Sequence, residues 1–235
     1  MVYNNNALFN WSGGKDSALC LHQVIQDKGF DIRFLLTTLN GANKRVSMHG
    51  VSENLLDMQA KSIGIPLKKI HLPEFPSIGE YETIISEFLN KAKSENIHIS
   101  IFGDIFLEDL REYREKQLAK MDFKAEFPLW KRDTKELAKE FINKGFKAII
   151  VSVDSRFLNE SFAGRIFDES FLNDLPKNVD PCGENGEFHS FVFDGPIFKN
   201  PIKFQKGEIV YKEYKSHSKE NPDENIGFWY CDLIA

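Results

Sequence analysis

The clearest chemical signal in the sequence is a glycine-rich segment that reads Ser12-Gly13-Gly14-Lys15-Asp16-Ser17. It lies between a short apolar run and a segment with helical spacing, so it is predicted to turn a strand into a helix. Two adjacent glycines let the backbone turn tightly and approach a ligand closely. The start of a helix offers free N–H groups and the positive end of the helix dipole, which suit a phosphate. Lys15 adds a positive charge and the serines add hydroxyl donors, so we predict a phosphate-binding loop.

Two common phosphate-binding patterns do not describe this loop. A Walker loop requires Ser or Thr directly after its Gly-Lys pair, whereas Gly14-Lys15 is followed by Asp16. The dinucleotide pattern GxGxxG is absent from the sequence. The alternative interpretation is an ordinary strand–helix turn with a capping residue. We favour a phosphate site because six adjacent residues combine so many phosphate-binding features.

The segments that position this loop alternate between apolar runs and helical patterns. After the loop, Ala18, Leu21 and Ile25 share one helical face. Ser77 and Glu80 have the spacing of a capping box at the start of another helix. Strands are predicted at residues 7–11, 32–39, 68–72 and 98–102, with a further helix at residues 51–63. This alternation indicates βαβ units and a mostly parallel sheet, in which ligands bind at the carboxyl ends of the strands.

The second half of the sequence has shorter predicted strands. Asp133 can cap a helix through Phe141, and residues 178–187 are rich in Asp, Pro, Gly and Asn, which is typical of a loop. Further helices are predicted at 107–118 and 168–175, strands at 148–153, 190–193, 202–204 and 208–214, and a polar segment or hairpin connection at 215–225. We expect an α/β fold with a parallel-sheet, Rossmann-like N-terminal domain over residues 1–124. A smaller α+β domain is expected over residues 125–235.

Composition and charge limit the class of protein. The 235 residues are 42% hydrophobic and 28% charged, which is typical of a globular chain rather than a disordered one. The 30 basic and 35 acidic residues give a net charge of −5, which argues against a general nucleic-acid-binding protein. No apolar run is long enough for a membrane helix, and the N-terminus lacks a signal-peptide pattern. We therefore expect a cytoplasmic location and no membrane partner.

The glycine-rich segment resembles the signature of the N-type ATP pyrophosphatases, also called the PP-loop family. This resemblance implies an adenine nucleotide alpha hydrolase-like N-terminal domain that binds ATP, cleaves it between the α and β phosphates and adenylates a substrate oxygen. It also implies that Lys15 and Asp16 are catalytic and that Asp16 binds the Mg²⁺ that accompanies ATP. The nucleotide-binding residues that it implies are Ser12, Gly13, Gly14, Lys15, Asp16, Ser17, Thr37, Gly103 and Asp104.

Other segments resemble the diphthine–ammonia ligase branch of that family. They are Arg45-Val46-Ser47-Met48-His49-Gly50, Phe102-Gly103-Asp104-Ile105 with Glu108 and Arg111 beyond, Pro128-Leu129-Trp130, and residues 180–189. The resemblance implies that ATP and ammonia convert a carboxylate acceptor into an amide. In those ligases the acceptor is diphthine, a modified histidine of elongation factor 2.

One loop departs from the ligase pattern. It reads Glu184-Asn185-Gly186-Glu187, where the ligases more often have Glu-Gly-Gly-Glu. The acceptor therefore stays open, and elongation factor 2 is an expected partner only if the organism makes diphthamide.

The implied chemistry needs a group that takes up a proton from ammonia. The candidates are His49, Glu184, Glu187 and His189, of which we assign His49 and Glu187 as catalytic, although His49 could instead cap a helix and Glu187 could be a solvated loop charge. The residues assigned to the substrate are Glu108, Arg111, Glu184, Asn185 and His189. Glu108 and Arg111 also have the spacing to pair with each other across one helical turn.

The three cysteines are Cys20, Cys182 and Cys231, and they are far apart without any CxxC spacing. This spacing predicts reduced thiols and no zinc or iron–sulfur site. Cys182 lies in the polar loop at residues 178–187 and is a candidate nucleophile, but no base is identifiable beside it.

Two other functions stay open at this point. Several PP-loop enzymes modify tRNA, although the acidic balance and the missing CxxC motif count against this alternative. A nucleotide-binding regulator without ligase activity is the other, and the intact Lys15-Asp16-Ser17 segment argues against it. The sequence is compatible with a monomer or a homodimer.

Overall fold

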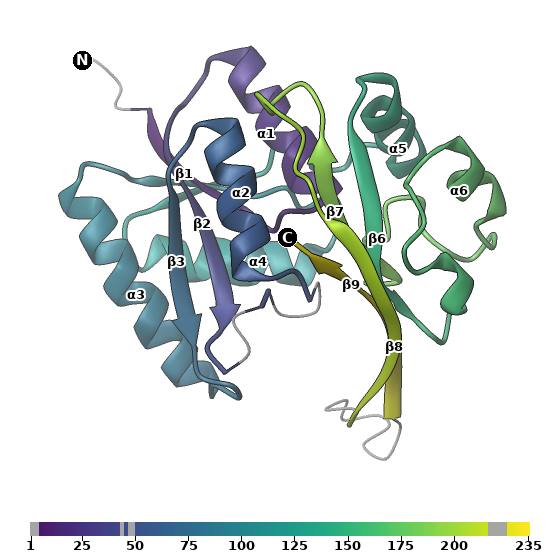
Figure 1. Cartoon of the computed structure of the whole chain (residues 1–235). Helices are drawn as coiled ribbons and strands as arrows, with labels where there is room; N and C mark the ends of the chain where they lie inside the picture. The colour runs from purple at the N-terminus through teal and green to yellow at the C-terminus, as the bar shows by residue number, and fades with distance from the viewer. Residues whose placement is uncertain (1–4, 43–44, 47–49, 216–224) are drawn as a thin grey trace.

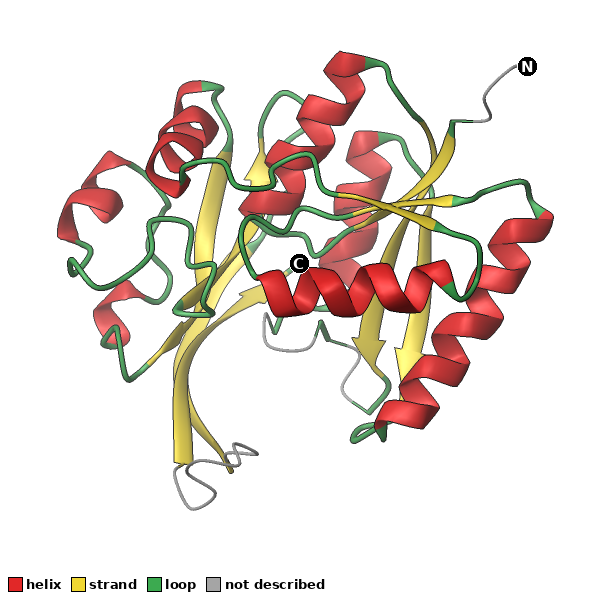
Figure 2. Ribbon diagram, turned by 180° about the vertical axis from the view of Figure 1, so that it is seen from behind, coloured by secondary structure: helices red, strands yellow, loops and turns green. Residues whose placement is uncertain are grey.

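The computed structural model describes residues 5–42, 45–46, 50–215 and 225–235. Within these residues the chain forms a five-stranded parallel sheet from its first half and a four-stranded antiparallel sheet from its second half (Figure 1). Figure 2 shows from behind that helices flank the first sheet. The predicted α/β class, with a Rossmann-like N-terminal part and an α+β C-terminal part, is confirmed.

The first sheet has the strand order β3-β2-β1-β4-β5, and each neighbouring pair is parallel. Its strands are β1 (Asn6–Asn10), β2 (Asp31–Asn40), β3 (Leu67–Leu72), β4 (Ile99–Ile101) and β5 (Lys124–Glu126). The chain moves outward from β1 to β3 and then crosses back to β4 on the other side of β1. The carboxyl ends of β1 and β4 therefore form the switch point, where open parallel sheets bind their ligands.

Side chains alternate along the strands, so both faces of this sheet are apolar and both are covered. In β1, Phe9 joins the buried cluster that contains Leu21 and Leu56, whereas Leu8 joins a second cluster with Leu89 and Leu118. The helices on the first face are α1 (Lys15–Asp27) and α2 (Glu53–Ile63), and those on the second face are α3 (Ile78–Ser94) and α4 (Glu108–Ala119).

The second sheet has the order β7-β6-β9-β8 and is antiparallel throughout. The elements of this half are α5 (Thr134–Asn143), β6 (Lys147–Asp154), α6 (Glu169–Asp174), β7 (Phe188–Asp194), β8 (Gln205–Lys215) and β9 (Asn225–Ile234), with a short 3-10 helix at Glu160–Phe162. Phe188 and Phe191 of β7 belong to the same buried cluster as Leu21 of α1. The second sheet therefore shares its core with the first face of the parallel sheet.

Most of the predicted elements are confirmed, including the capping box. The Ser77 hydroxyl accepts from the Glu80 backbone N–H, and the Glu80 carboxylate accepts from the Ser77 backbone N–H. The strand predicted at residues 202–204 is wrong, because this segment lies between β7 and β8, where the Ile202 N–H donates to the carbonyl of Phe193 without forming a strand. Strands β5 and β9 were not predicted. β5 is only three residues long and contains two charged residues, whereas β9 carries an aromatic run that the prediction omitted.

No helix in the described ranges is both long enough and apolar enough to cross a membrane. The division into residues 1–124 and 125–235 stays a prediction.

Candidate functional site

The glycine-rich loop lies at the carboxyl end of β1, and α1 begins directly after it at Lys15. Gly14 is the residue before the helix, and no side chain caps the helix start from that position. Gly13 has a φ of +79°, which favours glycine. A Cβ at Gly13 would also lie 2.9 Å from the side chains of Leu56 and Gln59. The loop therefore needs glycine at position 13 for its backbone conformation and for its close approach to α2.

A buried amide fixes the shape of this loop. Gln59 of α2 donates through Nε2 to the carbonyls of Gly13 and Val192, at 3.0 and 2.6 Å. Its Oε1 accepts from the indole N–H of Trp11 at 2.9 Å. The backbone N–H of Val192 donates to the same Gly13 carbonyl at 2.9 Å. The loop is thus held between α2 and β7, and Gln59 is a residue that sequence reasoning missed, because one amide inside a helix has no motif.

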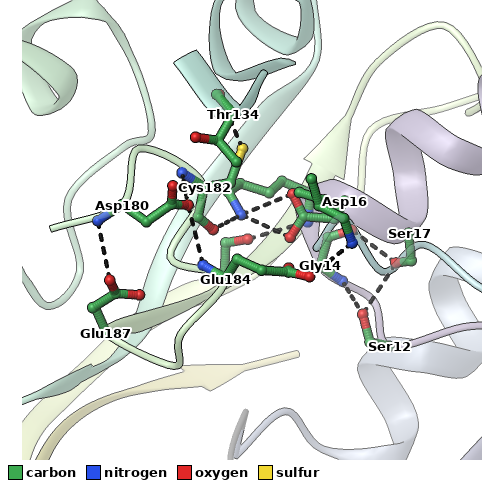
Figure 3. Close-up of polar contacts among 12 residues, drawn as sticks. Ser12, Gly14, Asp16, Ser17, Thr134, Asp180, Cys182, Glu184 and Glu187 are labelled. Atoms are coloured by element: carbon green, nitrogen blue, oxygen red, sulfur yellow. Dashed lines mark hydrogen bonds and ion pairs between the residues drawn. The ribbon is translucent and has the colours of Figure 1, made fainter. Parts of the chain in front are cut away.

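Lys15 is buried and its ammonium group is directed toward the polar loop before β7. Figure 3 shows the neighbouring Asp16 together with Cys182 and Glu184 of that loop. Nζ lies 2.7 and 3.0 Å from the two carboxylate oxygens of Asp16 and donates to the carbonyl of Cys182. The rings of Phe167 and Phe188 lie within 6 Å of the ammonium group, at 5.8 and 5.3 Å. Burial opposes the charged form of Lys15, but the charge and hydrogen bond of the Asp16 carboxylate, together with other nearby acidic groups, raise its pKa above the usual value. Lys15 is therefore charged at neutral pH.

The loop that meets Lys15 is organised by two carboxylates. Asp180 accepts from the backbone N–H groups of Cys182 and Glu184, at 2.9 and 3.2 Å. Glu187 accepts from the backbone N–H of Asp180 and from both the backbone and the side chain of Asn185, each at 3.0 Å. Glu187 is only 1% exposed. The side chains of Glu187 and Asn185 therefore bond to each other within the loop.

Cys182 is not placed as a reactive thiol. Burial raises the pKa of its thiol, although the nearby Lys15 ammonium opposes this effect. Its Sγ lies 3.2 Å from the carbonyl of Thr134, to which it donates. Because the thiolate is the nucleophilic form of cysteine, a thiol with a raised pKa is a poor nucleophile.

Glu184 connects the polar loop before β7 to the segment that follows β4. Its Oε1 accepts from the backbone N–H of Ile105 at 2.7 Å and from that of Phe106 at 3.3 Å. Burial, together with the negative charge of Asp16, raises the pKa of Glu184 to about 7. A carboxyl group that titrates near neutral pH can both release and accept a proton under physiological conditions.

The end of β4 lies directly against the start of α1. A Cβ at Gly103 would be 3.2 Å from backbone atoms of Asp16 and Ser17, so glycine allows this close approach. The next residue, Asp104, has an Oδ2 atom 3.2 Å from Nε of Arg114. Burial raises the pKa of the Asp104 carboxyl, although Arg114 opposes the shift. The two strands that form the switch point thus bring Asp16 and Asp104 to the same site.

Lys15, Asp16, Asp104 and Glu184 line one cavity of about 470 Å³. The cavity starts at the glycine-rich loop, crosses the carboxyl ends of β1, β2 and β4, and continues between α3 and α4. We call its far part the α3–α4 compartment, and its lining includes Tyr81, Glu82, Tyr113, Arg114, Gln117 and Met121. Glu82 and Gln117 are hydrogen-bonded across it at 2.6 Å.

The cavity brings together most of the sequence-predicted site residues. Those that line it are Ser12, Gly14, Lys15, Asp16, Ser17, Thr37, Gly103, Asp104, Glu184 and His189. Gly13, Glu187 and Asn185 support the surrounding loops instead of lining the cavity. His49 lies outside the described residues.

Two predicted substrate residues on α4 lie elsewhere. Glu108 pairs with Lys131 at 3.0 Å and Arg111 pairs with Glu115 at 2.7 Å, so the alternative that they pair with each other is wrong. Neither lines the cavity, whereas Arg114, one turn further along α4, does. Sequence reasoning missed Arg114, because α4 is rich in charged residues and no local signal distinguishes one arginine from the other.

The chain matches two family models. Residues 5–124 match the diphthamide synthase N-terminal domain, and residues 133–221 match the diphthamide synthase C-terminal domain.

Curated relatives show the same similarity over most of their length. The diphthine–ammonia ligase of Danio rerio is 28% identical over 229 residues, which cover 85% of this chain and 86% of the relative. The human diphthine–ammonia ligase is 26% identical over 222 residues, which cover 85% of this chain and 82% of the relative. Among solved structures, a tRNA thiolase from Methanococcus maripaludis with its iron–sulfur cluster matches at 17% identity and a TM-score of 0.35. That match covers 60% of this chain and 57% of the thiolase.

Proposed function

Because the chain belongs to the diphthamide synthase family, we propose that it is an ATP-dependent ligase that adenylates a carboxylate and converts it to an amide with ammonia. The observation that carries this proposal is the position of the glycine-rich loop. The loop lies at the switch point of a parallel sheet, and Lys15 and Asp16 of α1 line the cavity there. The curated relatives are named for diphthine and ammonia, which supports ammonia as the nucleophile and diphthine as the first acceptor to test.

The first step follows from the chemistry of the loop. A carboxylate oxygen of the acceptor attacks the α-phosphorus of ATP, and the bond between the α- and β-phosphates breaks. Pyrophosphate leaves and the acceptor becomes an acyl adenylate. The N–H groups at the start of α1 and the Lys15 ammonium would stabilise the negative charge that moves onto pyrophosphate. Lys15 must then exchange its contact with the Cys182 carbonyl for a phosphate oxygen.

The second step needs neutral ammonia. Its nitrogen attacks the carbonyl carbon of the acyl adenylate, the bond to the phosphate oxygen breaks, and AMP leaves with that bonding pair. One proton must be removed from the nitrogen to give the amide. Glu184 is the group that we assign to this proton, because it lines the cavity and has a pKa raised to about 7 by burial.

The residues at the switch point also fit Mg²⁺. Oδ2 of Asp104 is buried and accepts no hydrogen bond from any described residue. Within the described ranges no group of three or more acidic, histidine or cysteine side chains would hold a metal alone. This is the usual situation for Mg²⁺, which binds to one or two carboxylates together with substrate phosphates. Asp16 and Asp104 would hold the ion, which would neutralise phosphate charge.

The test is product identification with α-labelled ATP, Mg²⁺ and ammonia, with and without a diphthine-bearing acceptor or a cell extract. We expect AMP and pyrophosphate, and their loss in Lys15→Ala. Lys116→Ala is the matched control, since Lys116 is 73% exposed on α4 and should keep full activity. ADP as the product, or AMP formation that survives Lys15→Ala, would refute the proposal. Stimulation by tRNA without ammonia would instead favour a tRNA-modifying enzyme.

A further inference from the structure

Arg114 is held in the cavity in an unusual way. Its guanidinium lies 4.3 Å from the ring centroid of Phe102, so a ring contact fixes its position. Its Nε is 3.2 Å from Oδ2 of Asp104, but neither atom has a hydrogen-bond partner among the described residues. None of the five guanidinium N–H groups donates a hydrogen bond to another described residue. Arg114 is therefore held by an ion pair and a ring contact, while its Nε–H group donates no hydrogen bond to a described residue.

A stack of planar side chains supports this position. Phe102 is stacked on Phe127, with ring centroids 5.3 Å apart and planes inclined by 19°. The guanidinium of Arg111 lies 4.9 Å from the Phe127 ring and 4.6 Å from the Trp130 ring. The stack thus runs from the cavity to the segment after β5, in the order Arg114, Phe102, Phe127, Arg111 and Trp130. The planar guanidinium group suits such stacking, which a lysine ammonium would not reproduce.

The charges of the cavity indicate what Arg114 can bind. Among the lysines and arginines of the described ranges, only Lys15 and Arg114 line the cavity. Lys15 is surrounded by Asp16 and the carbonyl of Cys182, as described above. Arg114 faces one carboxylate, Asp104, without hydrogen-bond geometry. A planar guanidinium with free donors matches a phosphate or carboxylate in a bidentate way.

We infer that Arg114 is an anion-binding residue of the ligase site, and that Phe127, Arg111 and Trp130 are positioning residues that act through Phe102. This inference rests on the proposed function. The bound anion is either a phosphate of the nucleotide or the carboxylate of the acceptor. Arg111, which is predicted from the sequence to bind substrate, does not line the cavity and would instead act through Phe127 and Phe102.

Calorimetric titration with ATP, AMP and adenosine distinguishes the two sources. If Arg114 binds a nucleotide phosphate, Arg114→Gln weakens AMP binding by about tenfold to a hundredfold and leaves adenosine binding unchanged. If it binds the acceptor, nucleotide affinities stay as in the wild type. The amount of acceptor or active extract that gives half-maximal AMP formation then rises at least about tenfold. Arg33→Gln is the matched control, because Arg33 is 53% exposed at the amino-terminal end of β2.

The remaining outcomes overturn the inference. Suppose that the Arg114→Gln protein binds ATP, and that neither its AMP affinity nor the acceptor amount for half-maximal AMP formation changes. This result would refute the anion-binding role of Arg114 and leave the proposed function standing. An equal loss of adenosine affinity, together with a lower melting temperature, would mean that Arg114 is only structural. A wild-type protein that binds neither ATP nor AMP would overturn the proposed function as well.

Trp130 tests the positioning role separately. Arg114→Gln affects either the AMP affinity or the amount of acceptor needed for half-maximal AMP formation. Trp130→Leu should impair the same quantity by about two- to fivefold, since one cation–ring contact is lost. Trp130→Phe should restore it, because a phenyl ring can still stack on Arg111. Equal losses in both variants, or a loss that also appears when Arg114 is already replaced by Gln, would rule out positioning through the stack.

Discussion

Glu184→Gln is the substitution with the most specific expected effect. The change removes the titrating carboxyl group but keeps its size, and an amide oxygen can still accept from the backbone N–H groups of Ile105 and Phe106. Burial and the charge of Asp16 raise the pKa of Glu184 from 4.5 to about 7. The folded protein therefore holds a proton on Glu184 more tightly than the unfolded chain does.

The size and sign of the effect follow from that shift. A difference of about 2.5 pKa units corresponds to about 3 kcal/mol, which is an upper value because Glu184 is partly exposed. The group favours the folded state fully below pH 4.5, and this stabilisation is lost as the pH rises through 7. The wild-type free energy of unfolding should thus fall by up to about 3 kcal/mol more than that of Glu184→Gln between pH 4.5 and 8.

Urea unfolding at half-unit pH steps measures this difference directly. Glu112→Gln is the control, since Glu112 is 65% exposed on α4 and its variant should follow the wild-type curve. With the concentration of neutral ammonia held constant across the series, AMP formation by the wild type should rise as the pH passes 7, and Glu184→Gln should lack that rise. If the unfolding curves of Glu184→Gln and the wild type keep the same pH dependence, the buried position of Glu184 and its role as the proton acceptor are both wrong.

Two further predictions concern the frame of the loop. Gly103→Ala should cost about 1–3 kcal/mol and weaken ATP binding, because the new Cβ would press on backbone atoms of Asp16 and Ser17 at 3.2 Å. Urea unfolding and calorimetry check this, and a neutral result would contradict the close packing. Gln59→Leu should cost about 2–4 kcal/mol, because it leaves the Trp11 indole N–H and the Val192 carbonyl without their partner. An unfolding free energy within about 0.5 kcal/mol of the wild type would show that the clamp does not hold the loop.

The position of the glycine-rich loop between a strand and a helix, and the parallel sheet, could be predicted because their signals are local. The glycines, Lys15 and Ser17 follow one another in the sequence, and alternating apolar runs mark the strands of the first half. The position of Asp104 also follows from order along the chain, since it comes three residues after the end of β4 in the parallel sheet. Such inferences need no knowledge of how distant segments pack.

The remaining parts of the site depend on contacts between distant segments. Gln59 acts on Gly13 and Val192, which are 46 and 133 residues away. Arg114 and Arg111 are one turn apart on the same charged helix, and only the packing against Phe102 and Phe127 separates their roles. Glu187 has the residue type of a catalytic carboxylate, yet the loop around it uses its oxygens for N–H groups. These distinctions require the folded structure.

The proposed adenylation transfers a carboxylate oxygen of the acceptor to the α-phosphate of ATP. The most direct measurement uses the acceptor that stimulates AMP formation, with an oxygen isotope label in its carboxylate, and analyses the products by mass spectrometry. Adenylation followed by amidation predicts one labelled oxygen in AMP, none in pyrophosphate, and one nitrogen from ammonia in the acceptor. Unlabelled AMP, or a label that comes from water, would contradict adenylation of the carboxylate.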